Sequence, residues 1–268
     1  MRHIANGIAA AALLLANAAG AAGPLTKCPV DAVVAGTICM DRFEASVWRV
    51  PNPLGANRSV VKRIQQGTVT VALLEAAGAT PLGLARNIDD YAPCADSGQN
   101  CADDIYAVSL PGVEPSAKLT WFQAQAACEN ARKRLPSNAE WQAAVAGTPD
   151  PGEDDGTTAC NSASAFKAIA TGSRSACVSS RGAFDMVANL SEWVADWVPR
   201  ATACATWSPA VSPTADDQCF AGAAAAGEPA ALLRGGSFVS GAQAGPLAIL
   251  ATNPPSGPNG TVGFRCAR

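Results

Sequence analysis

Two carboxylates in the second half of the sequence have a spacing that could support acid–base chemistry. Glu192 and Asp196 are four residues apart, so one helical turn would place both acids on the same side. Paired carboxylates can exchange protons with a substrate. In a protein core such acids more often pair with arginines, and Arg234 and Arg265 are the candidates here. We therefore expect a structural role for the pair and predict no catalytic residue.

The histidine content excludes several other kinds of active site. The one histidine is His3, inside an N-terminal segment that we expect to be cleaved off. A mature chain without histidine cannot build Ser-His-Asp or Cys-His catalytic groups, histidine-ligated zinc, or iron sites that use histidine and carboxylate. No metal site is predicted from these residue types.

The N-terminus has the composition of an export signal. Arg2 and His3 precede an apolar run over residues 9–15, and small residues follow as far as Ala22. This pattern predicts a signal peptide over residues 1–22, and hence a secreted, periplasmic or cell-surface protein. No apolar run approaches the roughly 18 residues of a membrane span, so none is expected.

The charge of the chain argues against nucleic acid as a partner. Without Arg2, the 19 basic residues become 18 against 22 acidic ones, a net charge of −4, which does not suit a phosphate backbone. The basic run Arg132-Lys133-Arg134 falls at the end of a predicted helix, where cations complement the helix dipole.

The ten cysteines all lie in the mature part, and an even number in an exported chain indicates disulfides. Spacing suggests four local bridges and one long one. The predicted pairs are Cys28–Cys39, Cys94–Cys101, Cys160–Cys177, Cys204–Cys219 and, as the long one, Cys128–Cys266. Loop-closure entropy gives the long bridge about 5 kcal/mol against about 2.5 kcal/mol for the shortest.

A few elements can be predicted from local patterns. Alternation predicts a strand over residues 38–50, and residues 71–77 predict a short helix that Gly78 ends. Capping boxes at Thr120 and Ser137 predict two consecutive helices, running to about Arg134 and to near Gly147. No repeat or low-complexity linker interrupts the chain, so we expect one domain over residues 23–268.

Four ordered motifs carry a family resemblance. They are Arg-Leu-Pro-Ser-Asn-Ala-Glu-Trp at 134–141, Asp-Met-Val-Ala-Asn-Leu-Ser-Glu-Trp at 185–193, Leu-Arg-Gly-Gly-Ser-Phe at 233–238 and Gly-Phe-Arg-Cys at 263–266. Together they resemble the formylglycine-generating, sulfatase-modifying enzyme family. The resemblance implies a C-type-lectin-like α+β fold with mixed strands, few helices, much loop and a disulfide framework. It also supports the Cys128–Cys266 bridge.

The chemistry of that family does not carry over. The resemblance implies copper-dependent oxidation of a sulfatase cysteine, by two thiolates placed just after the third motif. Those positions are Ser240 and Gly245 here, and neither side chain is a soft-metal ligand. A sulfatase-modifying oxidoreductase, or an inactive homologue of one, is therefore only the alternative function.

Two smaller departures concern a turn and a metal. Ala188 stands where the family commonly has glycine, so a positive φ there would strain the backbone. Of the family's calcium ligands, only Asn161 and Asp185 have matching residues. No cofactor is predicted, and calcium stays open as a structural ion.

The C-terminal segment is also similar to the variable proteins of diversity-generating retroelements, in which a reverse transcriptase rewrites chosen codons. The resemblance implies that one set of positions is diversified: Val239, Ser240, Gln243, Leu250, Thr252, Asn253, Gly257, Asn259 and Thr261. The predicted function is thus an exported ligand-binding protein that displays a variable surface at residues 239–261. Its predicted partner is an external protein or a cell-surface glycan.

Overall fold

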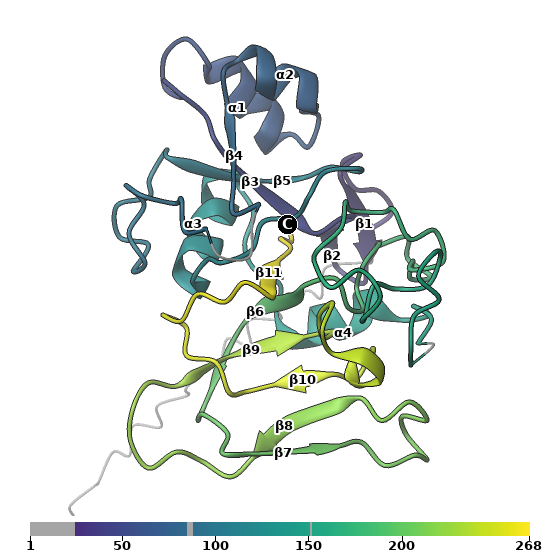
Figure 1. Cartoon of the computed structure of the whole chain (residues 1–268). Helices are drawn as coiled ribbons and strands as arrows, with labels where there is room; N and C mark the ends of the chain where they lie inside the picture. Colours follow the sequence, from purple (N-terminus) through teal and green to yellow (C-terminus); the bar gives the residue numbers. More distant parts are fainter. Residues whose placement is uncertain (1–24, 85–87, 151) are drawn as a thin grey trace, which may run out of the picture.

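The computed structural model describes residues 25–84, 88–150 and 152–268 (Figure 1). The predicted signal peptide over residues 1–22 lies outside the described residues. The first described elements are β1 (Ala32–Ala35) and β2 (Ile38–Asp41), which form a hairpin. A three-stranded sheet follows, in which β3 (Ala45–Arg49) lies between β4 (Thr80–Leu82) and β5 (Ile105–Ser109). The strand expected over 38–50 is therefore two strands, which residues 42–44 separate.

All six strands of the largest sheet come from the C-terminal half of the chain. Its strands, in spatial order, are β11 (Val262–Phe264), β6 (Ser191–Val198), β9 (Ala230–Arg234), β10 (Ile249–Leu250), β8 (Asp217–Ala221) and β7 (Ala203–Thr206). β11 pairs with β6 in parallel, and β10 pairs with β8 in parallel, while the other pairs are antiparallel. Parallel pairing returns the end of the chain to the middle of the molecule (Figure 1).

The helices are short. α1 (Arg58–Gln65) and α2 (Val71–Ala76) lie beyond the three-stranded sheet, far from β7 and β8 (Figure 1). α3 (Trp121–Asn130) and α4 (Asn138–Val145) both begin with the predicted capping boxes. The Thr120 hydroxyl accepts the Gln123 N–H at 3.1 Å, and the Gln123 amide oxygen accepts the Thr120 N–H at 3.0 Å. These local predictions are confirmed.

Two expectations about charged residues were wrong. α3 ends at Asn130, so the basic run does not belong to a helix terminus. Instead Lys133 is buried, and its Nζ lies 2.7 Å from Asp41 and 3.0 Å from Asp31. Glu192 lies on strand β6 rather than in a helical turn. Pairing with β9 and β11 determines the conformation there, and a spacing of four also keeps side chains on one side of a strand.

Five disulfides connect these elements, and they are the five pairs predicted from the sequence: Cys28–Cys39, Cys94–Cys101, Cys128–Cys266, Cys160–Cys177 and Cys204–Cys219. The long one ties α3 to the segment after β11. Such a number is typical of proteins that fold in an oxidising compartment. Within the described ranges, no helix is long and apolar enough to cross a membrane.

Candidate functional site

The carboxylate pair that could have served acid–base chemistry is used structurally. Glu192 and Arg265 form a buried ion pair with an N···O distance of 2.6 Å, and their side chains are 1 % and 0 % exposed. The other Glu192 oxygen accepts the indole N–H of Trp141 at 2.7 Å. Asp196 accepts the backbone N–H of Asn138 at the start of α4. Both acids are therefore occupied by partners within the protein.

Arg234, the other predicted partner, lies elsewhere. Its guanidinium donates to the side-chain oxygens of Asn138 and Gln142 and lies 4.6 Å from the centre of the Trp141 ring. Burial lowers the pKa of Arg234 to about 10. Thus Arg234 fastens α4 to the end of β9 through neutral oxygens rather than through a carboxylate.

A buried carboxylate that the sequence did not single out completes this charged core. Glu44 accepts the backbone N–H of Leu190 at 2.9 Å and the side-chain N–H of Asn189. Burial, with the nearby charges of Asp185 and Glu192, raises the pKa of Glu44 well above its ordinary value. Glu44 thereby holds the turn before β6, although 145 residues separate it from Asn189.

That turn has the strained conformation expected at its alanine. Ala188 has φ = 63° and Asn189 has φ = 54°. Ala188 is fully buried, and its N–H donates to the Gly235 carbonyl at 3.0 Å. The surrounding contacts thus hold Ala188 in a left-handed backbone conformation, which costs about 1–2 kcal/mol of conformational free energy.

The two positions where a copper site would require thiolates make other contacts in this structure. Ser240 accepts the Ser237 N–H at 2.9 Å. A Cβ atom on Gly245 would lie only 2.2 Å from a carboxylate oxygen of Asp216. Asp216 is buried and accepts hydrogen bonds from the Ser212 hydroxyl at 2.8 Å and the Leu247 N–H at 2.7 Å. Since those bonds fix the carboxylate, a side chain at position 245 has no space.

We expect Gly245→Ala to lower the free energy of unfolding by about 1–3 kcal/mol, because the added methyl group overlaps a fixed carboxylate. Urea denaturation followed by circular dichroism measures the loss. Ser240→Ala is the matched control and should cost about 1 kcal/mol, the value of one hydrogen bond. An unchanged Gly245→Ala variant would show that the Asp216 loop yields easily and that this position can still hold a side chain.

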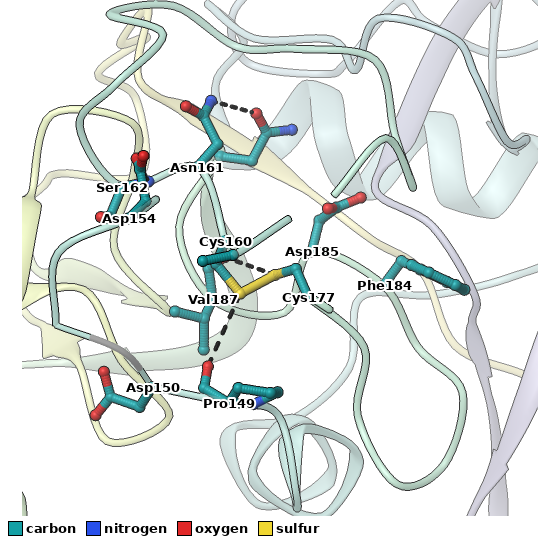
Figure 2. The surroundings of a disulfide bond; sticks show 12 residues. Pro149, Asp150, Asp154, Cys160, Asn161, Ser162, Cys177, Phe184, Asp185 and Val187 are labelled. Carbon is teal, nitrogen blue, oxygen red and sulfur yellow. Dashed lines mark hydrogen bonds between the residues drawn. A yellow bond between two sulfur atoms is a disulfide. The ribbon is translucent and has the colours of Figure 1, made fainter. Parts of the chain in front are cut away.

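The two candidate calcium ligands lie near the Cys160–Cys177 disulfide (Figure 2). The Asn161 amide N–H groups donate to the Lys167 carbonyl at 2.9 Å and to Asn189 at 3.0 Å, while its buried oxygen has no hydrogen-bond partner among the described residues. Asp185 accepts the Gly172 N–H at 2.7 Å. Burial raises the pKa of Asp185 to about 6. Among the described residues, no group of three or more histidine, cysteine or acidic side chains could hold a metal.

The acidic loop near these residues is closed by backbone donors. Asp154 accepts four backbone N–H groups at 2.8–2.9 Å, and the donors are Gly156, Ser162, Ala163 and Ser164. Burial would raise its pKa, but these hydrogen bonds hold the pKa of Asp154 far below its ordinary value. The four amides therefore stabilise the ionised carboxylate of Asp154 and hold the loop closed around it.

We expect 5 mM EDTA to leave the melting temperature of the protein within about 2 °C of its value in 5 mM CaCl₂, since less than about 0.5 kcal/mol should depend on the ion. Differential scanning fluorimetry measures this, with NaCl added to equalise ionic strength. A calcium-dependent rise that Asn161→Ala abolishes would instead identify a structural calcium at the unpaired Asn161 oxygen.

None of the nine predicted binding residues is buried. Val239, Gln243 and Asn259 are exposed, and the other six are partly exposed. They run from the 3-10 helix η1 (Gly241–Gln243), along β10, to the loop before β11. Figure 1 shows η1 at one end of β10 and this loop at the other. The segment thus presents two groups of side chains with Leu250 between them.

The backbone of the segment is tied to the rest of the fold. Main-chain hydrogen bonds of 2.9–3.1 Å hold it, among them Gly241 N–H to Ser162 O, Trp121 N–H to Pro255 O, Lys118 N–H to Asn259 O, Ser191 N–H to Thr261 O and Ala231 N–H to Asn253 O. The path of the segment is therefore held by main-chain contacts, which do not depend on the identity of the exposed side chains.

A small pocket is lined by sequence neighbours of these residues, although none of the nine lines it. It has a volume of about 110 Å³, and its lining includes Phe238, next to Val239, and Gly260, between Asn259 and Thr261. Its other apolar walls come from Leu84 and Phe166, and Phe166 is 78 % exposed. Sequence reasoning missed both residues. The sequence feature that could have identified Phe166 is that it is an aromatic residue in a loop of mostly small residues.

Comparisons with known proteins identify the family. A model of the sulfatase-modifying factor enzyme 1-like domain matches residues 64–268. No curated protein sequence matches the chain. Among solved structures, the Major Tropism Determinant I1 variant has a TM-score of 0.47 and 17 % identity, covering 91 % of this chain and 54 % of that one. CarF has a TM-score of 0.41 and 15 % identity, covering 86 % and 85 %. Variable protein 1 of Treponema denticola has a TM-score of 0.38 and 19 % identity, covering 70 % and 84 %.

The chain spans about half the length of the Major Tropism Determinant structures that it matches. Its mixed strands, short helices and five disulfides form the expected α+β, C-type-lectin-like fold of the formylglycine-generating type. Because the family model covers most of the sequence, the chain belongs to the sulfatase-modifying factor enzyme 1-like family.

Proposed function

We propose that this protein binds an external ligand through the side chains of residues 239–261, and that it is an exported variable protein of a diversity-generating retroelement. The observation that carries the proposal is the combination of a tethered backbone with nine accessible residues, eight of which carry a side chain. A rigid scaffold that presents adaptable side chains on loops is the usual basis of recognition surfaces. The filled space at Gly245 counts against copper chemistry at the same place.

The chemistry of the nine residues defines how the surface would recognise its ligand. All nine are uncharged, and they offer amides, hydroxyls and two aliphatic side chains. Recognition would therefore rest on hydrogen bonds and apolar contact, and it should depend little on salt concentration. Such a surface suits an external protein or a cell-surface glycan.

The proposal predicts that these positions can be changed without loss of the fold. A library randomised at Val239, Gln243, Asn259 and the six partly exposed positions should consist mostly of folded members. A substitution at an accessible position usually costs about 0.5 kcal/mol or less, and about 1 kcal/mol at Ser240, which loses a hydrogen bond. Yeast display with protease challenge measures the folded fraction. A control library at Leu233, Val262 and Phe264, all 2 % exposed or less, should lose most members, at about 2–5 kcal/mol per truncation.

Equal losses in both libraries would contradict a replaceable surface. Diversification itself has a separate test in the DNA. The coding sequence for residues 239–261 should have a near-copy in the same genome, beside a reverse transcriptase gene, and should differ from it mainly where the copy has adenine. Without such a copy, the claim reduces to a binding protein of fixed sequence.

A further inference from the structure

Three aromatic rings meet at the surface where α3 begins and β6 ends. The ring centres of Trp121 and Trp197 are 5.0 Å apart, and the Phe122 ring lies 5.5 Å from each of them. Trp197 is 44 % exposed, while Trp121 and Phe122 are partly exposed. The indole N–H of Trp121 donates to the Val194 carbonyl at 2.8 Å, which fixes the orientation of that ring. An aromatic cluster that remains open to solvent requires an explanation beyond core packing.

A pocket of about 150 Å³ adjoins two of these rings. Its polar lining consists of Ser97, Gln99, Gln125 and Glu129, and Trp121 and Phe122 supply the apolar wall. The Cys94–Cys101 disulfide closes the loop that carries the first two. Gly98 lets that loop approach α3, because a Cβ atom there would lie 2.9 Å from the Phe122 carbonyl oxygen.

The composition of the pocket indicates its ligand. The pocket combines flat aromatic walls with two amides, a hydroxyl and a carboxylate, and its lining contains no lysine or arginine. Small-molecule sites typically pair apolar or aromatic walls with a few placed polar groups. A sugar ring matches this pair, since it has a face of C–H groups and an edge of hydroxyls. Glu129 and the absence of a cation in the lining disfavour acidic sugars, phosphates and acidic peptides.

We propose that this pocket is a carbohydrate subsite that takes a neutral hexose or N-acetylhexosamine residue of a glycan. The sugar packs its C–H groups into the corner between the rings of Trp121 and Phe122, whose planes meet at 86°. Trp197 extends the aromatic surface to the next residue of the glycan. Gln99 and Glu129 bind the sugar's hydroxyls, and Gln125 orients Glu129 by donating to its carboxylate at 2.7 Å. These residues lie outside 239–261, so the subsite does not require that segment to be diversified. It adjoins the segment, however, because the Trp121 N–H donates to the Pro255 carbonyl at 2.9 Å.

The test uses methyl glycosides of glucose, galactose, mannose and N-acetylglucosamine, with methyl glucuronide as the acidic comparison. Saturation-transfer NMR and tryptophan fluorescence of residues 23–268 follow each titration. We expect at least one neutral glycoside to bind saturably at millimolar concentration, and the glucuronide to bind at least tenfold more weakly. Gln99→Ala should weaken that binding at least fivefold, and Trp197→Ala should weaken binding of the corresponding methyl disaccharide at least fivefold. Both side chains are exposed, so both variants should fold.

Phe220→Ala is the matched control, because Phe220 is also an exposed aromatic residue, 49 % accessible, but lies on β8. It should leave sugar binding unchanged. A second control replaces Val239, Gln243 and Asn259 together, and it should retain sugar binding even where the proposed ligand surface is lost. Lack of saturable binding by every neutral glycoside, or equal binding of the disaccharide by Trp197→Ala and Phe220→Ala, would overturn the subsite. Either result would leave the proposed ligand surface at residues 239–261 to be tested separately.

Discussion

Replacing Arg265 by methionine should lower the free energy of unfolding by about 3–5 kcal/mol, because the Glu192 carboxylate would remain buried without its counter-charge. Both side chains are almost fully inaccessible. The negative charges of Glu192, and then of Glu44 and Asp185, raise the pKa of Arg265 against the effect of burial. Its guanidinium further donates to the Phe184 carbonyl at 2.8 Å and the Asp41 carbonyl at 3.1 Å. The loss should therefore lie at the upper end of the range for an ion pair.

A second arginine–glutamate pair of the same length provides the control. Arg134 and Glu140 also approach to 2.6 Å, but their side chains are 45 % and 24 % exposed. Arg134→Met should cost about 0–1 kcal/mol, as exposed pairs usually do. Urea denaturation of both variants at pH 7 gives the two losses. Equal losses would mean that burial does not set the energetic role of Arg265, and that the charged core is more hydrated than its geometry indicates.

Removal of the Cys128–Cys266 bridge by paired alanine substitution should cost about 5 kcal/mol, the largest effect expected from any of the five disulfides. The bridge spans 138 residues, so its loss frees the longest loop in the unfolded chain. It also releases the end of β11 from α3, and both sulfurs belong to fully buried residues. The unfolding midpoint in guanidinium chloride should fall accordingly.

The Cys94–Cys101 bridge is the appropriate comparison, because it is equally buried but spans only seven residues. Its paired alanine variant should lose about 2.5 kcal/mol. Non-reducing peptide mapping must first establish that the four remaining bridges are intact in each variant. A short-loop variant that loses as much stability as the long-loop variant would show that packing around the sulfurs, rather than loop entropy, determines the effect.

Features that depend on neighbouring residues could be predicted from the sequence. The capping boxes at Thr120 and Ser137 involve donors and acceptors three residues apart, so local chemistry was sufficient. Four of the disulfides are local as well. The long bridge was suggested by spacing and by the family resemblance together.

Features that depend on tertiary contact could not be predicted. Nothing near Lys133 in the sequence indicates that Asp31 and Asp41 surround it, since these acids are 102 and 92 residues away. The conformation of residues 191–198 follows from pairing with two other strands, and the acids alone suggested a helix. The pocket beside Val239 requires Leu84 and Phe166, which come from separate loops. The aromatic cluster likewise joins residues 76 positions apart, from Trp121 to Trp197.

The position of residues 266–268 has a consequence for how the protein is made. Ala267 exchanges backbone hydrogen bonds with Arg134, Arg268 does so with Cys39, and the Cys266 carbonyl accepts the Asp41 N–H. These contacts join the first hairpin and the middle of the chain, so this part of the core can close only after residues 266–268 have been synthesised. Until Cys266 is available, Cys128 also lacks the partner of its bridge. A fragment that stops before residue 266 should therefore leave this part of the core unpaired.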